Sequence, residues 1–250
     1  MTVDEAASRL SKISTQWPEL AAAHADASSA VSAQASLLSR YCSAVHHYLL
    51  ASTRDQHAAE ELGQEFALRF VRGDFHRAEQ ARGRFRDFIK AVLRNLVADH
   101  YRRLRNRPAE LRPDSEVIAP GGYDPADADA EFNSHWRQEL LDRTWEEFRT
   151  LNEGSNQPYH DVLRWKADHP DRNANDGAEE FTRRLGRDVK PAAFRQMLHR
   201  AREGFAELLL AEVARSLGGS DPELIARELA DLGLLVYCGP ALEKVGSSAC

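Results

Sequence analysis

Apolar residues recur at steps of three and four along most of this chain, which is the pattern of amphipathic α-helices. The clearest stretch runs from Arg82 to Arg103, and one side of it is wholly apolar: Phe85, Phe88, Ile89, Val92, Leu93, Leu96, Val97 and Tyr101. On the opposite side Arg86, Lys90 and Arg94 follow one another at four-residue steps, where like charges repel by about 0.2–0.5 kcal/mol per pair. Such a face is either an ordinary solvated helix surface or a surface on which a bound polyanion relieves the repulsion.

The same periodicity predicts an all-α protein of two small helical domains. We expect a mobile amino-terminal lead at residues 1–35, a first helical domain at 36–105, a linker at 106–133, a second domain at 134–217 and a carboxy-terminal tail with a short helix at 218–250. Prolines and glycines, together with a lack of apolar periodicity, indicate the linker. The second domain is expected to open with a helix that turns Trp136 and Trp145 inward.

A helix expected from about Asp55 to Val71 is apolar on one side and acidic on the other. Its inward residues include Leu62 and Phe66, and its outer rim carries Glu60, Glu61, Gln64 and Glu65. Paired carboxylates perform acid–base chemistry when burial shifts their pKa values, but this rim lies on the wet side with no nucleophile nearby. A solvated face or a protein-docking rim is therefore favoured over catalysis.

Residues 178–217 predict a helix-turn-helix. A short helix from Ala178 to Leu185 ends at Gly186, a residue suited to the left-handed conformation after a helix, and Pro191 suits the first turn of a long helix that continues to Leu217. The outward residues at the start of the long helix are mostly basic: Lys190, Arg195, Gln196, His199, Arg200 and Arg202. Such a helix fits the major groove of DNA, where Arg and Gln bond to base edges and phosphates.

Composition and charge narrow the class of protein. The mean hydropathy of -0.55 and the lack of a long apolar run exclude a transmembrane span, and the acid-containing amino-terminus is unlike a signal peptide, so we expect a cytoplasmic protein with no membrane partner. The net charge of -6 argues against a protein that coats nucleic acid indiscriminately. Basic residues are nevertheless concentrated, with ten Lys/Arg against three Asp/Glu in residues 82–112 and seven against one in residues 183–202.

Neither the cysteines nor the histidines predict a metal site, and no cofactor is expected. The 3 cysteines are far apart and odd in number, which favours neither a disulfide framework nor a metal knuckle. Cys42 lies in an apolar helix pattern and is expected to be a small buried residue. Adjacent His46 and His47 point about 100° apart on a helix, so they are expected to be packing or surface residues.

Several of these segments together resemble a known family. Three segments resemble region 2 of the extracytoplasmic-function (ECF) sigma factors of bacterial RNA polymerase, which belong to the sigma-70 family. The segments are LLSRYCSAVHHYLL, HAAEELGQEFALRF and GRFRDFIKAVLRNLVADHYRR. Region 4 of the same family resembles AEEFTRRLGRDVKPAAFRQMLHRARE. The resemblance covers about Ser36 to Leu217, and its first domain is the more specific match. It departs from the usual family form at the recognition helix, which reads Pro-Ala-Ala-Phe-Arg-Gln here, and in the longer loop DHPDRNANDG.

The resemblance implies a non-enzymatic transcription initiation factor that binds core RNA polymerase and directs it to specific promoters. The polymerase would be bound by Glu60, Glu61, Leu62, Gln64, Glu65 and Phe66. The promoter minus-ten element would be bound by the loop His76 to Gly83 and by Arg84, Arg86, Lys90, Arg94, Asn95, Asp99 and Arg102. The minus-thirty-five element would be read by Lys190, Arg195, Gln196, His199 and Arg200. An anti-sigma or other regulatory protein is a further expected partner.

The residues alone leave two other classes open. One is a stand-alone helix-turn-helix regulator that binds an operator without polymerase. The other is a helical adaptor whose basic faces meet an acidic protein. An enzyme is the least favoured class, because the sequence contains no phosphate-binding loop, no metal-spaced His/Cys set and no nucleophile with a placed base.

Overall fold

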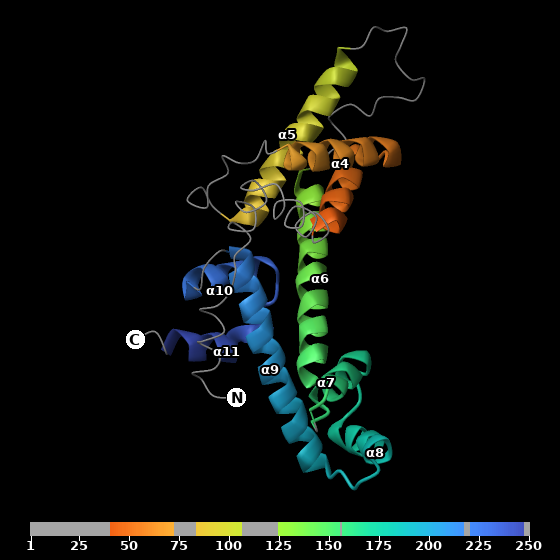
Figure 1. Cartoon of the computed structure of the whole chain (residues 1–250), viewed down its shortest axis with the longest axis vertical. Coiled ribbons are helices and arrows are strands. Elements are labelled where there is room, and N and C mark those ends of the chain that lie inside the picture. The colour runs from red at the N-terminus through yellow and green to blue at the C-terminus, as the bar shows by residue number, and fades with distance from the viewer. Residues whose placement is uncertain (1–40, 73–83, 107–124, 156, 218–220, 248–250) are drawn as a thin grey trace. The chain divides into compact units, whose positions relative to one another are not determined.

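The computed structural model describes residues 41–72, 84–106, 125–155, 157–217 and 221–247. The expected lead, the loop His76 to Gly83 and most of the expected linker lie outside these residues. Within them the chain forms α-helices and no β-strand, which confirms the all-α class (Figure 1). A helix of residues 41–53 is followed by α4 (Gln56–Val71), α5 (Phe85–Arg105), α6 (Pro125–Asn152), α7 (Tyr159–Asp168), α8 (Ala174–Leu185), α9 (Pro191–Leu217), α10 (Pro222–Asp231) and α11 (Leu235–Ser247).

The chain divides into two compact units, and the division falls inside two long helices. The described part of the amino-terminal unit ends at Glu139 and also includes residues 214–217. The described part of the carboxy-terminal unit consists of Leu140–Val213 and residues 221–247. Helices α6 and α9 therefore contribute residues to both units.

Aromatic side chains from three helices form the core of the amino-terminal unit. Tyr41 stacks on Trp136 of α6 with ring centroids 4.4 Å apart, and it contacts Phe85 of α5 at 5.6 Å. Tyr48 meets Phe132 of α6 edge-on at 6.1 Å. All five rings are buried, and aromatic side chains of this size contribute most of the apolar area of a small core.

Helices α4 and α5 have bounds close to those that their patterns predict. Asp55 caps the start of α4, because its carboxylate accepts hydrogen bonds from the backbone amides of His57 at 2.9 Å and Ala58 at 3.2 Å. Helix α5 runs without interruption from Phe85 to Arg105, since this stretch contains neither proline nor glycine. The two helices pack together and cross in Figure 1.

Helix α6 begins at Pro125, so residues 125–133 are helical although we expected them to be part of the linker. Buried residues follow one another at four-residue steps through this stretch: Ala128, Phe132, Trp136 and Leu140. Trp136, which was expected to open the second domain, packs instead in the core of the amino-terminal unit. The prolines and glycines just before residue 125 concealed this periodicity, because we extended the linker past their end.

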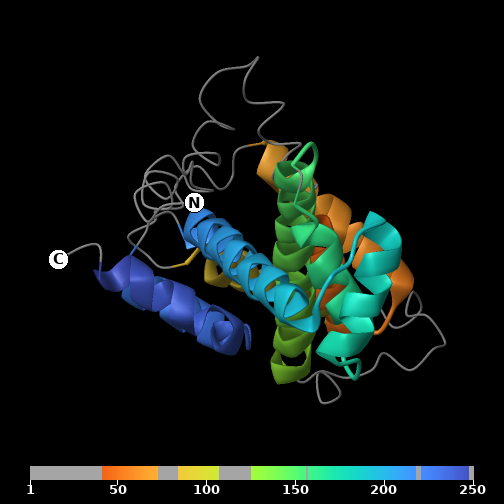
Figure 2. The ribbon, with the colours of Figure 1, turned by 90° about the horizontal axis from the view of Figure 1, so that it is seen from below.

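The carboxy-terminal unit contains the expected helix-turn-helix, built from α8, a turn and α9. A buried cluster joins α7, α8 and α9, and Figure 2 shows these helices side by side: Val162, Trp165, Ala178, Phe181, Val189, Phe194 and Leu198. Gly186 ends α8 with a φ of 63°, in the left-handed region that favours glycine. In the turn, the backbone amide of Val189 donates to the hydroxyl oxygen of Thr182 at 2.9 Å, which closes the turn onto α8.

Helix α8 begins earlier than its pattern predicted, at Ala174 rather than at Ala178. Asn173 caps it and Asp176 bonds back to the amide of Asn173, so the two residues form a reciprocal capping box. Gly177, near the start of α8, lies directly against the buried ring of Phe194 of α9. The loop DHPDRNANDG is therefore shorter than expected, because its last four residues, 174–177, belong to α8.

The tail forms two helices where we expected one. Asp221 caps α10, and α10 packs against α11, which contains Pro240. The hydrophobic residues Val236 and Tyr237 lie exposed on α11.

Candidate functional site

The outward face of α4 is the expected polymerase-binding rim. Glu60, Glu61 and Gln64 are exposed on it. Glu60 accepts a hydrogen bond from Gln56 at 2.6 Å, and Glu61 lies 3.5 Å from His57, both one helical turn away on α4 itself. Exposed pairs of this kind contribute little stability, so these carboxylates are available to a partner.

Two of the residues expected on this surface are buried beneath it. Leu62 and Phe66 belong to the core, where they hold α4 in place. Leu68 is an outward residue that the sequence analysis missed, with 47% of its surface exposed. The signal was present, because Leu68 lies four residues after Gln64 and seven after Glu61, on the same face of a helix.

Glu65 connects α4 to α5 instead of projecting outward. Its carboxylate accepts hydrogen bonds from Arg69 at 2.5 Å and from Arg103 of α5 at 2.9 Å. Burial acts to raise the pKa of Glu65, but the bonds from Arg103 and Arg69 outweigh it and lower the pKa below its ordinary value. Glu65 therefore positions the rim on α5, and its charge is already shared between two guanidinium groups.

The basic row of α5, which we define as Arg86, Lys90 and Arg94, is largely covered, whereas both readings of the sequence, a solvated face and a polyanion-binding face, need it to be exposed. Arg86 is only 2% exposed and donates to the side-chain oxygen of Asn133 of α6 at 2.7 Å. Lys90 is also buried, and its ammonium lies 3.5 Å from Asp129 of α6. The sequence did not predict this cover, because Asp129 and Asn133 belong to residues that were read as linker.

Arg94 is the accessible end of the basic row. Its side chain is 49% exposed, and its guanidinium donates to Asp129 at 2.6 Å. Burial acts to lower the pKa of Arg94, but the Asp129 carboxylate and contact with Tyr48 outweigh it and raise the pKa. Arg94 therefore stays charged and can meet a phosphate from the solvent side.

The other candidates on α5 differ in their surroundings. Arg84 bonds to Asp87 at 2.8 Å, and Asp99 accepts from the exposed Arg102 at 2.7 Å. Asn95 is exposed next to Arg94. An accessible strip thus runs along α5 from Arg94 towards Arg102, beyond the covered part of the row.

The outward face at the start of α9 is exposed, as the sequence predicted. Lys190, Arg195 and Gln196 make no side-chain hydrogen bond or ion pair within the described part of the chain. Their backbone is held by the buried Phe194 and Leu198, which face the opposite way into the cluster with α7 and α8. This arrangement offers two cations and an amide to an external acceptor without disturbing the core.

Two further candidates on α9 have internal partners. His199 lies 3.6 Å from Glu203, one turn further along. Arg200 donates to the hydroxyl of Tyr159 of α7 at 3.4 Å, and this bond raises the pKa of its guanidinium. Both side chains remain exposed, but Arg200 points towards α7 and is less suited to reach a base than Arg195.

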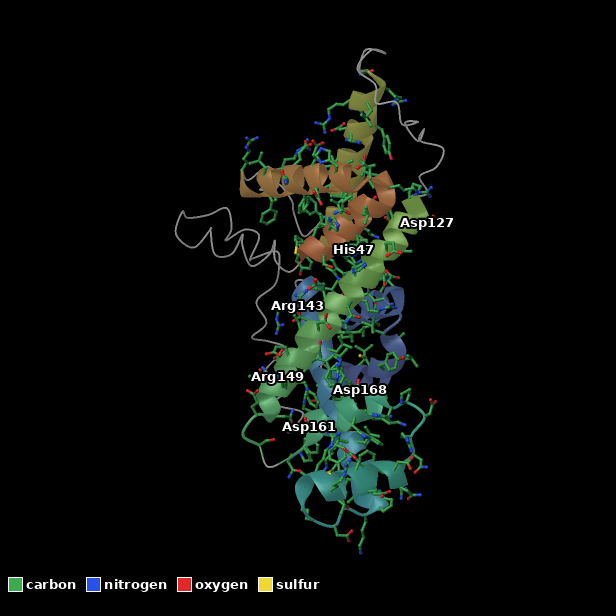
Figure 3. The ribbon with its side chains drawn as sticks, turned by 90° about the vertical axis from the view of Figure 1, so that its right-hand side faces the viewer. His47, Asp127, Arg143, Arg149, Asp161 and Asp168 are labelled. Atoms are coloured by element: carbon green, nitrogen blue, oxygen red, sulfur yellow. The ribbon has the colours of Figure 1, made fainter. Side chains whose placement is uncertain are left out.

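The described residues show how two other expectations stand. Cys42 is exposed, so the expectation that it is buried was wrong, whereas Cys238 is buried and burial raises its pKa to about 11. His47 packs as expected, with the centroid of its ring 3.4 Å from that of His135 of α6, and it is labelled in Figure 3.

Among the described residues, no group of three His, Cys, Asp or Glu could hold a metal ion. No helix of the described residues has the length and hydropathy that a membrane crossing needs.

Comparison with known proteins finds a match to a family model that covers part of the amino-terminal unit. Residues 37–107 match the family model for sigma-70 region 2, which covers the helix of residues 41–53, α4 and α5. No curated protein and no solved structure matches the chain. The match ends before α6, so the residues that cover the basic row lie outside it.

Proposed function

Because residues 37–107 match the family model for sigma-70 region 2, we propose that the chain is an ECF-type sigma factor that acts in transcription initiation and recognises promoters through both of its units. In this proposal the amino-terminal unit docks on core RNA polymerase through α4 and holds the minus-ten element along α5. The carboxy-terminal unit reads the minus-thirty-five element with α9. The family points to a non-enzymatic protein that works beside the polymerase, so we expect it in the cytoplasm, and an anti-sigma or other regulatory protein remains an expected partner.

The observation that carries the proposal is a set of exposed residues at the start of α9 that have no side-chain partner among the described residues: Lys190, Arg195 and Gln196. They lie on a chain whose residues 37–107 match sigma-70 region 2. Arg195 and Gln196 project from a helix that a glycine-ended α8 and a closed turn hold in place. Arg bonds two acceptors of guanine and Gln bonds adenine in the major groove, and each such pair contributes about 1–3 kcal/mol of discrimination. The match to region 2 supports polymerase binding, and in this proposal α9 is a second DNA-binding helix, which reads the minus-thirty-five element.

The docking surface is tested by a charge reversal on α4. Glu61→Arg changes an exposed carboxylate without touching the Glu65–Arg103 contact, and Glu179→Arg makes the same change at an exposed position of α8. We expect Glu61→Arg to weaken the binding of core polymerase at least tenfold and Glu179→Arg to leave it within about twofold, since close like charges across an interface cost several kcal/mol. Equal binding by both variants would remove α4 as the docking surface.

Promoter reading is tested by run-off transcription with reconstituted polymerase on a genomic library, followed by sequencing of the products. Arg195→Ala should lower initiation at selected promoters by roughly 5- to 150-fold, which corresponds to the loss of one base-reading pair, and should leave polymerase binding unchanged. If the purified protein alone protected a specific DNA site as tightly as the complex does, a stand-alone helix-turn-helix regulator would be the better description. If the polymerase initiated no better with the protein than without it, the proposal would be refuted.

A further inference from the structure

We propose that Asp129 of α6 is an intramolecular competitor for nucleic-acid phosphate at Lys90 and Arg94, so that the start of α6 limits DNA binding by α5. The proposal rests on the proposed function, because it takes α5 to be a nucleic-acid surface. It adds a residue and a control of binding that lie outside the part of the chain that matches region 2.

The contacts show that α6 runs along the basic row in the opposite direction. Asp129 bonds Arg94 at 2.6 Å and lies 3.5 Å from Lys90, whereas Asn133 bonds Arg86 at 2.7 Å. Positions 129 and 133 are one turn apart on α6, as successive members of the row are on α5, so the two sets of polar groups are in register. The side of α5 that the sequence predicted for a polyanion is thus occupied by a carboxylate and an amide of the same chain.

The cover is tight at one end and open at the other. Arg86 and Lys90 are buried, but the Arg94 side chain is half exposed and 23% of the Asp129 side chain remains accessible. Within the described residues, the second carboxylate oxygen of Asp129 is buried and accepts no hydrogen bond. An unsatisfied buried acceptor costs free energy, so the short bond between Asp129 and Arg94 is offset in part at the end of the row that solvent reaches.

A phosphate group would satisfy these cations better than Asp129 does. Phosphate oxygens accept bidentate bonds from a guanidinium, and a nucleic acid brings further charges that a single carboxylate lacks. Phe132 and Trp136 anchor the next turns of α6 in the core, so binding at Arg94 requires only that the Asp129 carboxylate leave it. Lys90 keeps a second carboxylate, that of Asp87 on α5, at 3.7 Å. Until it leaves, its negative charge repels an incoming phosphate and lowers the apparent affinity.

The test compares two substitutions that remove the same charge from the same helix. Asp129→Asn breaks the contact with the row, whereas Asp127→Asn changes an exposed residue in the first turn of α6, labelled in Figure 3. Binding of the full-length protein to a fluorescent single-stranded DNA is measured by fluorescence anisotropy across a series of salt concentrations. Thermal unfolding by circular dichroism reports whether each variant is folded.

We expect Asp129→Asn to bind single-stranded DNA about fivefold more tightly than the wild type, the factor by which one partly exposed ion pair favours the covered form. Its log–log salt dependence should steepen by about 0.7 for each phosphate gained, and Asp127→Asn should change the affinity less than twofold. In an Arg94→Gln background the gain should disappear. This double variant also remains informative if Asp129→Asn alone loses stability, because it separates the contact from the fold.

Three results would overturn the inference: equal effects of the two aspartate substitutions, weaker binding by Asp129→Asn, or an undiminished gain in the Arg94→Gln background. Weaker binding would make Asp129 a positioning residue that orients the cations. The proposed function fails in a different assay, since run-off transcription by the wild-type protein with polymerase does not depend on the comparison between Asp129 and Asp127.

Discussion

Substitution of Trp136 by alanine distinguishes the expected domain boundary from the observed one. The indole is 1% exposed and stacks on Tyr41, and it also contacts Phe85 and Phe132. If residues 134–217 formed one domain, the loss of this side chain would weaken the helix-turn-helix. In the structure it removes the centre of the amino-terminal core instead.

The magnitude follows from the buried area. An indole buries about 150–250 Å², which at about 25 cal/mol per Å² corresponds to about 4–6 kcal/mol as an upper limit. Because the indole nitrogen is buried without an acceptor within the described residues, its removal offsets part of that loss. We therefore expect Trp136→Ala to lower the free energy of unfolding of the amino-terminal unit by about 3–4 kcal/mol. Trp136→Phe should lower it much less, because a phenyl ring keeps part of the aromatic packing and the unsatisfied N–H donor is removed.

Hydrogen–deuterium exchange with mass spectrometry locates the effect along the full-length chain. Trp136→Ala should speed exchange in peptides from α4 and α5 and leave α8 unchanged. Trp145→Ala is the matched control, because Trp145 packs on Phe205 of α9 at 4.5 Å in the carboxy-terminal unit and should affect α9. If Trp136→Ala loosened α8 and spared α5, or lowered stability by less than about 1 kcal/mol, the assignment of Trp136 to the amino-terminal core would be wrong.

Two further predictions test local packing and charge. Gly177→Ala would place a methyl group 2.3–2.7 Å from three carbons of the Phe194 ring, so it should lower the free energy of unfolding in urea by about 1–3 kcal/mol and weaken promoter reading. Gly239→Ala, with open space around it, should be neutral, and equal costs of the two substitutions would disprove the close approach of α8 and α9. Burial and the neighbouring His47 lower the pKa of His135 below 6.5 against the opposing pull of Glu131, so the unfolded chain binds the proton more readily than the folded chain. Stability should therefore fall as the pH drops below about 6.5, and urea titrations of His135→Gln should show a shallower fall; an unchanged pH profile would refute the assignment to His135.

Periodicity alone determined most of the secondary structure and the fold class. The steps of three and four that predict α5 and α9 also identify their buried faces, because a long helix with one apolar stripe has one way to bury it. Local chemistry determined several ends as well, such as the cap at Asp55, the left-handed Gly186 and Pro191 at the start of α9. The exposed set on α9 followed from the same reasoning, since its opposite face is plainly apolar.

Only the tertiary structure decided which charged residues are accessible. A periodic pattern shows that Arg86 and Lys90 lie opposite the apolar stripe, but it does not show that Asp129 and Asn133 of a distant helix cover them. Likewise, the acidic pattern of α4 treats Glu61 and Glu65 alike, although Arg103 bonds only Glu65. The physical reason is that propensity and amphipathicity act over a few turns of one helix, whereas ion pairing and burial of polar groups depend on residues that the fold brings together from far along the chain.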